Sequence, residues 1–198
     1  MPDIVIMEKP ESVSYEEIHE VLYRAHESNR QKGFVVRTAL MTGEQLEKHI
    51  GPNGKCFVAM DGDKVVGTVS YRIKKCSLWC VKGPAVDRIL VGVLPEYKGM
   101  HIATKLFTAV YDAAIAGKYK WIISGTQDQN TLMQEICLKD GFMKVDFSSV
   151  KPDHYAVIMV KWLGKCPYTS TMISIMYMAK KAYVKLRYKP GHVKRFGI

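Results

Sequence analysis

Residues 86–114, VDRILVGVLPEYKGMHIATKLFTAVYDAA, form the stretch around which the chain is organised. Residues 86–94 are rich in β-branched and aliphatic side chains and stop at Pro95, which is typical of a buried strand. Beyond Lys98 and Gly99, apolar residues recur at the spacing of one helical face: Ile102, Leu106, Ala109, Val110, Ala113 and Ala114. The stretch therefore predicts a strand, a short turn and an amphipathic helix that starts near Lys98 and Gly99.

The turn between this strand and this helix has the features of an anion site. A helix N-terminus presents unpaired amides and the positive end of the helix dipole. The small Gly99 lets a ligand approach the backbone closely. These residues are compatible with a phosphate-type ligand and also with a plain helix start that binds nothing.

The length and composition of the chain limit its class. Its 198 residues suit one domain with a full core, and no apolar run is long enough to span a membrane. We expect no signal peptide in MPDIVIMEKP, and the odd number of five cysteines favours reduced thiols and a cytoplasmic location. Cys76 and Cys80 have no second Cys or His pair at zinc spacing, so no metal site is expected.

Local signals along the chain predict the remaining elements. Two capping boxes, Ser14 with Glu17 and Thr42 with Gln45, mark the starts of two helices. Apolar runs on either side of an Asp-Gly turn predict a β-hairpin, followed by a loop over residues 74–84 in which residues 78–81 are also compatible with an extension of a strand. The expected strands are 3–7, 56–60, 64–74, 86–94, 119–124, 142–147 and 155–162, and a further helix covers 128–139. This β-α-α-β-β-β-α-β-α-β-β order predicts an α/β fold with a mixed sheet and helices on both faces.

Two motifs in this order resemble a known family. Residues 93–103, VLPEYKGMHIA, resemble motif A of the GCN5-related N-acetyltransferases (GNAT), commonly V-x-P-x-[YF]-[RQK]-G-x-G-I-[GA]. The family's N-x2-A-x2-L-Y-x3-G-F pattern is matched at its spacing by Asn130, Ile136, Gly141 and Phe142. The resemblance implies a GNAT-like acyltransferase domain over residues 1–163, followed by a basic extension over 164–198.

The resemblance also implies a cosubstrate, acetyl-CoA, and its site. Acyl-CoA would lie in a V-shaped gap between the strand 87–93 and the strand that begins at Tyr119. Lys98 would hold the pyrophosphate, backbone groups of the preceding strand would hold the pantetheine arm and thioester carbonyl, and Asn130 would contact the cofactor. In this family an amine attacks the acyl carbon directly, without an acyl-enzyme. The implied backbone contacts are those of Leu90, Val91 and Val93 for the arm, and Gly99, Met100, His101, Ile102 and Ala103 for the pyrophosphate.

The chemistry requires a base, hydrogen-bond donors for the oxyanion and a proton donor for the thiolate. Asp87 lies on the strand face of Ile89 and Val91, at the offset where the histone-acetylating branch has its general-base Glu, and is the expected base. The alternative is a salt-bridged carboxylate at a strand end. Arg88 points to the other face, and Gly92 is the expected bulge residue that supplies N–H donors.

The sequence departs from the family pattern at two positions. Cys137 stands where the family often has a proton-donating Tyr, so this thiol is either the donor or a packing residue. His101 stands where motif A usually has Gly, at a position expected to be helical. Its imidazole either contacts the cofactor or is simply exposed.

The C-terminal part of the chain carries its positive charge. Of the net +10, nine Lys and Arg residues follow Asp153 with no acidic residue, which leaves 20 basic against 19 acidic residues before it. Residues 168–187 can form an amphipathic helix, either packed on the body with a basic rim or attracted to an acidic partner. An acyl carrier protein, a membrane surface and a homodimer are open alternatives, whereas nucleic acid is not expected.

We expect an N-acetyltransferase that acts on a primary amine of a small molecule or peptide. The alternatives are a longer-chain N-acyltransferase that uses acyl-CoA or an acyl carrier protein, and a non-catalytic domain that binds CoA or a partner. The acceptor is not indicated, and its loops would be 33–42, 74–84 and 148–154. Tyr71 and Trp79 either line the acceptor side or belong to the core.

Overall fold

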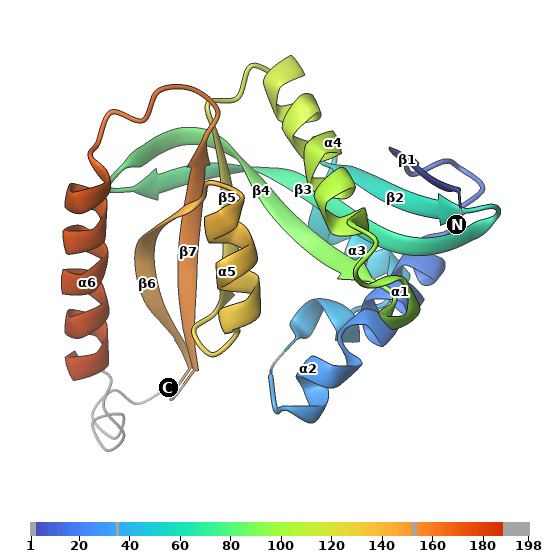
Figure 1. Cartoon of the computed structure of the whole chain (residues 1–198), viewed down its shortest axis with the longest axis horizontal. Helices are drawn as coiled ribbons and strands as arrows, with labels where there is room; N and C mark the ends of the chain where they lie inside the picture. Colours follow the sequence, from blue (N-terminus) through green and yellow to red (C-terminus); the bar gives the residue numbers. More distant parts are fainter. Residues whose placement is uncertain (1–2, 35, 152–153, 188–198) are drawn as a thin grey trace. The chain divides into compact units, whose positions relative to one another are not determined.

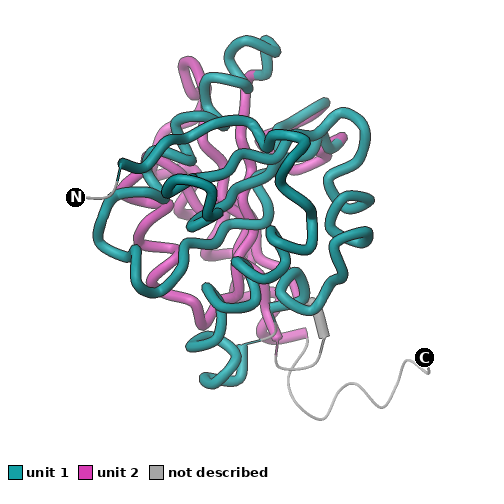
Figure 2. The backbone as a smooth tube through the Cα atoms, turned by 90° about the vertical axis from the view of Figure 1, so that its right-hand side faces the viewer, with its two compact units in different colours: residues 1–74, 84–119 teal, residues 75–83, 120–198 magenta. Residues whose placement is uncertain are grey.

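The computed structural model of the chain describes residues 3–34, 36–151 and 154–187 (Figure 1). These residues form seven strands, six α-helices and two 3-10 helices, and the predicted α/β class is confirmed. The backbone divides into two compact units, shown in separate colours in Figure 2. Unit 1 comprises residues 1–74 and 84–119, and unit 2 comprises residues 75–83 and 120–198.

Unit 1 is built on neighbouring strands in the order β1-β2-β3-β4. β1 pairs antiparallel with β2, and β2 pairs antiparallel with β3 through the predicted hairpin. The bounds of the strands are β1 Ile4–Glu8, β2 Lys55–Asp61, β3 Lys64–Leu78 and β4 Val81–Val93. The tips of β3 and β4, residues 75–78 and 81–83, belong to unit 2.

The helices of unit 1 cover both faces of these strands. A Cβ on Gly92 would meet Leu22 of α1, whereas the side chain of the next residue, Val93, lies with Ile102 of α4 around Gly67. Because successive strand residues point to opposite faces, α1 and α4 lie on opposite sides. The helices are α1 Tyr15–Ala25, α2 Glu27–Gln31, η1 Arg37–Leu40, α3 Gly43–Ile50, η2 Pro95–Tyr97 and α4 Ile102–Ala116.

Unit 2 contains an antiparallel sheet in the order β5-β7-β6, with α6 packed against β6 (Figure 1). Its core includes the fully buried side chains of Phe142, Phe147, Met159 and Ile173. The elements are β5 Trp121–Gln127, α5 Thr131–Lys139, β6 Met143–Lys151, β7 His154–Trp162 and α6 Ser170–Arg187. The predicted C-terminal helix is confirmed as far as Arg187, and the expected basic residues Lys189, Lys194 and Arg195 lie outside the described residues. None of the helices in the described ranges is both long and apolar enough to cross a bilayer.

Two sequence-based expectations about the elements are wrong. The segment 74–84 is not a loop, because β3 runs to Leu78 and β4 starts at Val81. Trp79 at the tip donates a hydrogen bond from Nε1 to the carbonyl of Val145 at 2.9 Å and lies 5.1 Å from the Tyr168 ring, so tertiary contacts hold the extended backbone. The helix after β4 begins at Ile102 and not near Lys98, because η2 and a turn with two positive φ angles come first.

Candidate active site

Leu90, inside β4, adopts a left-handed backbone conformation with a φ of 53°. This conformation costs a non-glycine residue about 1–2 kcal/mol, and it interrupts the regular strand geometry. Gly92 as the bulge residue stays a prediction, and the positive φ lies two residues earlier, at Leu90. Gly92 allows α1 to approach, because a Cβ there would lie 3.1 Å from Leu22 Cδ2 and 3.2 Å from Ala25 Cβ.

The carbonyl of the next residue, Val91, accepts a hydrogen bond from His26 Nε2 at 2.8 Å. A carbonyl can only accept, so Nε2 carries the proton, and Asn29 Nδ2 donates to the other ring nitrogen at 3.1 Å. The bond that Nδ1 accepts requires the neutral imidazole, because a protonated ring has no free lone pair there. Burial, together with the charges of Arg30 and Lys98, lowers the pKa of His26 below its ordinary value, and the bond to Val91 opposes this in part. His26 and Asn29 thus fix one peptide group directly after the irregular residue.

The N-terminus of α4 differs from those of α1, α3 and α5. Those three helices are capped by the side chains of Ser14, Thr42 and Asn130. In the described structure the cap residue of α4, His101, makes no such bond and has a φ of 57°. The expectation that His101 lies within the helix is therefore wrong: it is an exposed cap residue in the left-handed region.

The turn before His101 leaves backbone open to ligands. Gly99 has a φ of 85°, and no atom lies within 4 Å of the position that its Cβ would occupy. Lys98, Gly99 and Met100 are exposed, whereas Ile102 is buried and anchors the helix on β3, and Ala103 is half-buried. The first-turn amides of α4, the helix dipole and the Lys98 ammonium together provide the chemistry of an anion site.

Asp87, on β4, forms an ion pair with Arg72 of β3. Nε and Nη2 of Arg72 donate to the same oxygen, Oδ2, at 3.0 and 2.9 Å, and Asp87 is 8% exposed. His49, in the last turn of α3, lies 3.4 Å from Nη1 of Arg72. Burial and the Arg72 charge lower the pKa of His49, and Asp87 raises it in part. A neutral imidazole and an oriented carboxylate thus share one guanidinium.

The other polar and aromatic residues singled out by the sequence have structural contacts. Arg88 is buried on the α4 side, where it donates to the Tyr111 hydroxyl at 3.1 Å and its guanidinium carbon lies 3.9 Å from the centroid of the Phe107 ring. Tyr71 is buried beside Phe57, with ring centroids 6.3 Å apart. Trp79 lies at the tip of the β3–β4 hairpin, in unit 2, and contacts Val145 and Tyr168 there.

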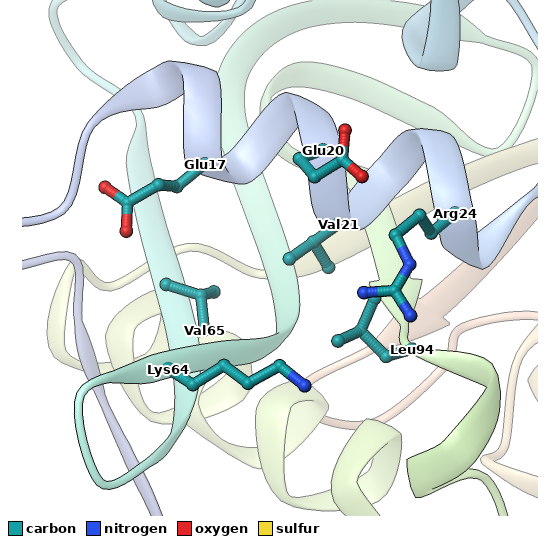
Figure 3. A pocket seen from close by; sticks show the side chains of 7 residues that line it. All are labelled: Glu17, Glu20, Val21, Arg24, Lys64, Val65 and Leu94. Carbon is teal, nitrogen blue, oxygen red and sulfur yellow. The ribbon is translucent and has the colours of Figure 1, made fainter.

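An open pocket of about 190 Å³ lies in unit 1 between α1 and the β2–β3 turn (Figure 3). Val21, Val65 and Leu94 supply its apolar lining, and the charged side chains at its edge come from Glu17, Glu20, Arg24 and Lys64. Arg24 and Lys64 both contact Glu96 Oε1, at 2.9 and 3.6 Å. Because charges of both signs line the pocket, it does not select an anionic over a cationic ligand.

The two remaining predicted residues, Asn130 and Cys137, belong to α5 of unit 2. Asn130 is the cap residue, and its Oδ1 accepts from the Met133 amide at 3.2 Å. Cys137 is only 1% exposed on the inward face, which supports packing, and its proposed role as proton donor stays a prediction. Gln134, also buried, donates to the carbonyls of Gln127 and Asp128 at 3.2 and 2.8 Å and so fixes the end of β5.

The sequence did not indicate His26, Asn29, His49, Arg72 or Gln134. The partner of His26 lies 65 residues away, and the partners of Arg72 lie 15 and 23 residues away, so no local pattern reveals these contacts.

Comparisons with known proteins agree with this geometry. A family model described as the acetyltransferase (GNAT) family matches residues 15–142, which include Leu90, the start of α4, Asn130 and Cys137. No curated protein matches the chain significantly.

Several solved structures share the fold at low identity. An acetyltransferase from Streptococcus agalactiae is 17% identical with a TM-score of 0.63, over 82% of this chain and 100% of that chain. The ribosomal-protein-S18-alanine N-acetyltransferase from Escherichia coli is 13% identical with a TM-score of 0.63, over 84% of this chain and 99% of that chain. A GNAT family acetyltransferase from Elizabethkingia anophelis with acetyl-CoA bound is 14% identical with a TM-score of 0.60, over 82% of this chain and 100% of that chain. Because the family match extends over more than half of its length, the chain belongs to the GNAT acetyltransferase family.

Proposed function

We propose that the chain is an N-acetyltransferase that transfers an acetyl group from acetyl-CoA to a primary amine. The observation that carries the proposal is the strand–turn–helix unit of family motif A. Its strand has a strained residue at Leu90, and its helix α4 begins without a side-chain cap in the described structure. Acetyl-CoA is bound to the Elizabethkingia anophelis relative.

The residues of this strand–turn–helix segment fit the cosubstrate. The open space at Gly99 and the exposed Lys98 suit a pyrophosphate, which the amides of Gly99, Met100, His101, Ile102 and Ala103 would also contact. The backbone of Leu90, Val91 and Val93 would bind the arm of the cosubstrate. His26 already occupies one acceptor position of the Val91 carbonyl, and a carbonyl oxygen has a second lone pair.

Acetyl-CoA supplies an activated acetyl thioester when bound. The protein must then keep the attacking amine neutral by removing its proton. Asp87 is our first candidate base because the family resemblance places the general base at this position of β4, and Arg72 orients its carboxylate. The same ion pair is the one that the alternative, a purely salt-bridged carboxylate, expects. His49 is a second candidate, since its lowered pKa keeps the imidazole neutral and able to accept a proton at neutral pH.

Binding is tested by isothermal titration of the full chain with acetyl-CoA, free CoA and longer acyl-CoAs. We expect Lys98→Gln to weaken acetyl-CoA binding about tenfold, because it removes one charge-assisted hydrogen bond. Lys105→Gln, at an exposed lysine of the neighbouring helix α4, is the matched control and should leave the affinity unchanged. A preference for a longer acyl-CoA would support the longer-chain acyltransferase instead.

Catalysis is tested by following CoA release over a panel of primary amines. Removal of the base should lower kcat by about 10²–10⁴ without weakening acetyl-CoA binding. Asp87→Asn and His49→Gln therefore distinguish the two candidates, and only the true base also alters the pH profile of kcat. Tight acetyl-CoA binding without turnover on any amine would contradict the proposal and favour a non-catalytic CoA-binding domain.

A further inference from the structure

The outer face of α6 exposes an unusual amount of apolar surface. Of the fourteen large apolar side chains that are exposed among the described residues, six lie on this one helix, with exposures between 41% and 64%. We call these six residues the α6 stripe: Met172, Ile175, Met176, Met178, Tyr183 and Leu186. A contiguous exposed apolar patch of this kind marks a surface that meets a partner.

The stripe is not needed to hold α6 in place. The opposite face of the helix provides the buried residues Ile173, Tyr177 and Val184. Tyr177 packs edge-on against Phe147 of β6, with ring centroids 6.3 Å apart. A helix that is apolar on two opposite faces is normally covered on both, so the α6 stripe requires an occupant outside unit 2.

The charges beside the stripe are positive. Lys180, Lys181, Lys185 and Arg187 lie on α6, which has no acidic residue. Asp128 contacts Lys181 at 2.9 Å and Lys185 at 3.4 Å, and Asp146 contacts Lys180 at 3.7 Å. Two aspartates therefore pair with three of these lysines, and the side chains of Lys180 and Lys185 remain 47% and 49% exposed.

This combination discriminates between possible occupants. A second copy of the chain docked through the same stripe would bring two positively charged rims together without acidic residues to compensate them. An anionic bilayer offers an apolar layer for the methionine, isoleucine and leucine side chains directly beneath negative headgroups for the lysines and Arg187. Tyr183 has the amphipathic ring that is favoured at the level of the headgroups.

We propose that the α6 stripe docks the protein on an anionic lipid surface, with α6 lying in the plane of the interface and its basic residues contacting the headgroups. The proposal goes beyond acetyl transfer and does not depend on it. The charge of the sequence agrees with an anionic partner, since nine basic and no acidic residues follow Asp153.

The test is co-sedimentation of the full chain with vesicles of phosphatidylcholine alone and with vesicles that also contain phosphatidylglycerol. We expect clear binding to the anionic vesicles, at least about tenfold tighter than to the neutral ones, and weaker binding at high salt. Ile175→Gln should lower the partition coefficient about tenfold by removing apolar burial. Lys185→Gln should lower it about fivefold by removing one charge.

Leu132→Gln is the matched control, because Leu132 is 68% exposed on α5, outside the stripe. It should bind vesicles like the unchanged protein, and thermal unfolding should show that all three variants are folded. Absence of binding to anionic vesicles, or binding that Ile175→Gln leaves intact, would overturn the proposal. A dimer in analytical ultracentrifugation that Ile175→Gln dissociates would also overturn it, because the stripe would then join two copies.

Discussion

Substitution of Gly67, on β3, by alanine should disturb the start of α4, because α4 packs directly on Gly67. The new Cβ would lie 3.2 Å from Ile102 Cγ2, 3.3 Å from Leu106 Cδ1 and 3.3 Å from Val93 Cγ2. Ile102 and Leu106 are 2% and 0% exposed, so neither can move toward solvent. Overpacking of this kind costs about 1–3 kcal/mol, and the lower chain entropy of alanine returns about 0.5–1 kcal/mol.

The net loss, about 1 kcal/mol within a range of about 0–2.5 kcal/mol, should lower Tm by roughly 2–4 °C in a chain of this size. Calorimetry measures the shift, and isothermal titration should show weaker acetyl-CoA binding because Ile102 begins α4. Gly125→Ala in β5 is the control, since its Cβ would meet Ile158 Cδ1 at an ordinary 3.4 Å. If Gly67→Ala matched Gly125→Ala in both Tm and affinity, the idea that Gly67 sets the position of α4 would be refuted.

Further predictions concern protonation, thiol reactivity and helix caps. The pKa of His26 is lowered in the folded state from the ordinary 6.5, so the unfolded chain binds more protons near and below pH 6.5, and stability should fall as the pH falls. His26→Gln should therefore make Tm less dependent on pH between pH 8 and 5.5. An unchanged pH dependence of Tm in this variant would assign the effect to another group. Burial raises the pKa of Cys80 to about 11, so iodoacetamide at pH 8 should label the half-buried Cys166 first, as mass spectrometry of the native protein can show. Ser14→Ala and Thr42→Ala should each cost about 1 kcal/mol in denaturant unfolding through loss of a capping box, and no loss would mean that water replaces the caps.

Local features of the fold could be predicted from the sequence. Each capping box joins residues three positions apart, so the residue types alone indicate the bonds that the structure contains. The Asp-Gly turn indicated the β2–β3 hairpin in the same way, and Gly141, with a φ of 83°, ends α5 as expected. The motif A resemblance predicts a strand, a turn and a helix, and the structure contains them as β4, η2 and α4.

The details of the candidate site could not be predicted, because tertiary contacts decide them. Nothing about leucine favours a positive φ, so the strained conformation of Leu90 has no signal in the sequence. The Arg72 bridge between Asp87 and His49 joins three elements, α3, β3 and β4. His101 was expected in the helix because its sequence neighbours are helical. The turn at Gly99 delays the helix, which begins at Ile102, one residue after His101.

The two units are interleaved along the chain, and this has a consequence for biosynthesis. Residues 75–83 are made before most of unit 2, yet the partners of Trp79 within that unit, Val145 and Tyr168, emerge from the ribosome much later. Until then the nascent chain presents the indole and the thiol of Cys80 without their cover. A chain cut after residue 119 would therefore keep this hairpin tip with its apolar side chains uncovered. A separately made 120–198 fragment should bind to it, as complementary fragments of a split protein do.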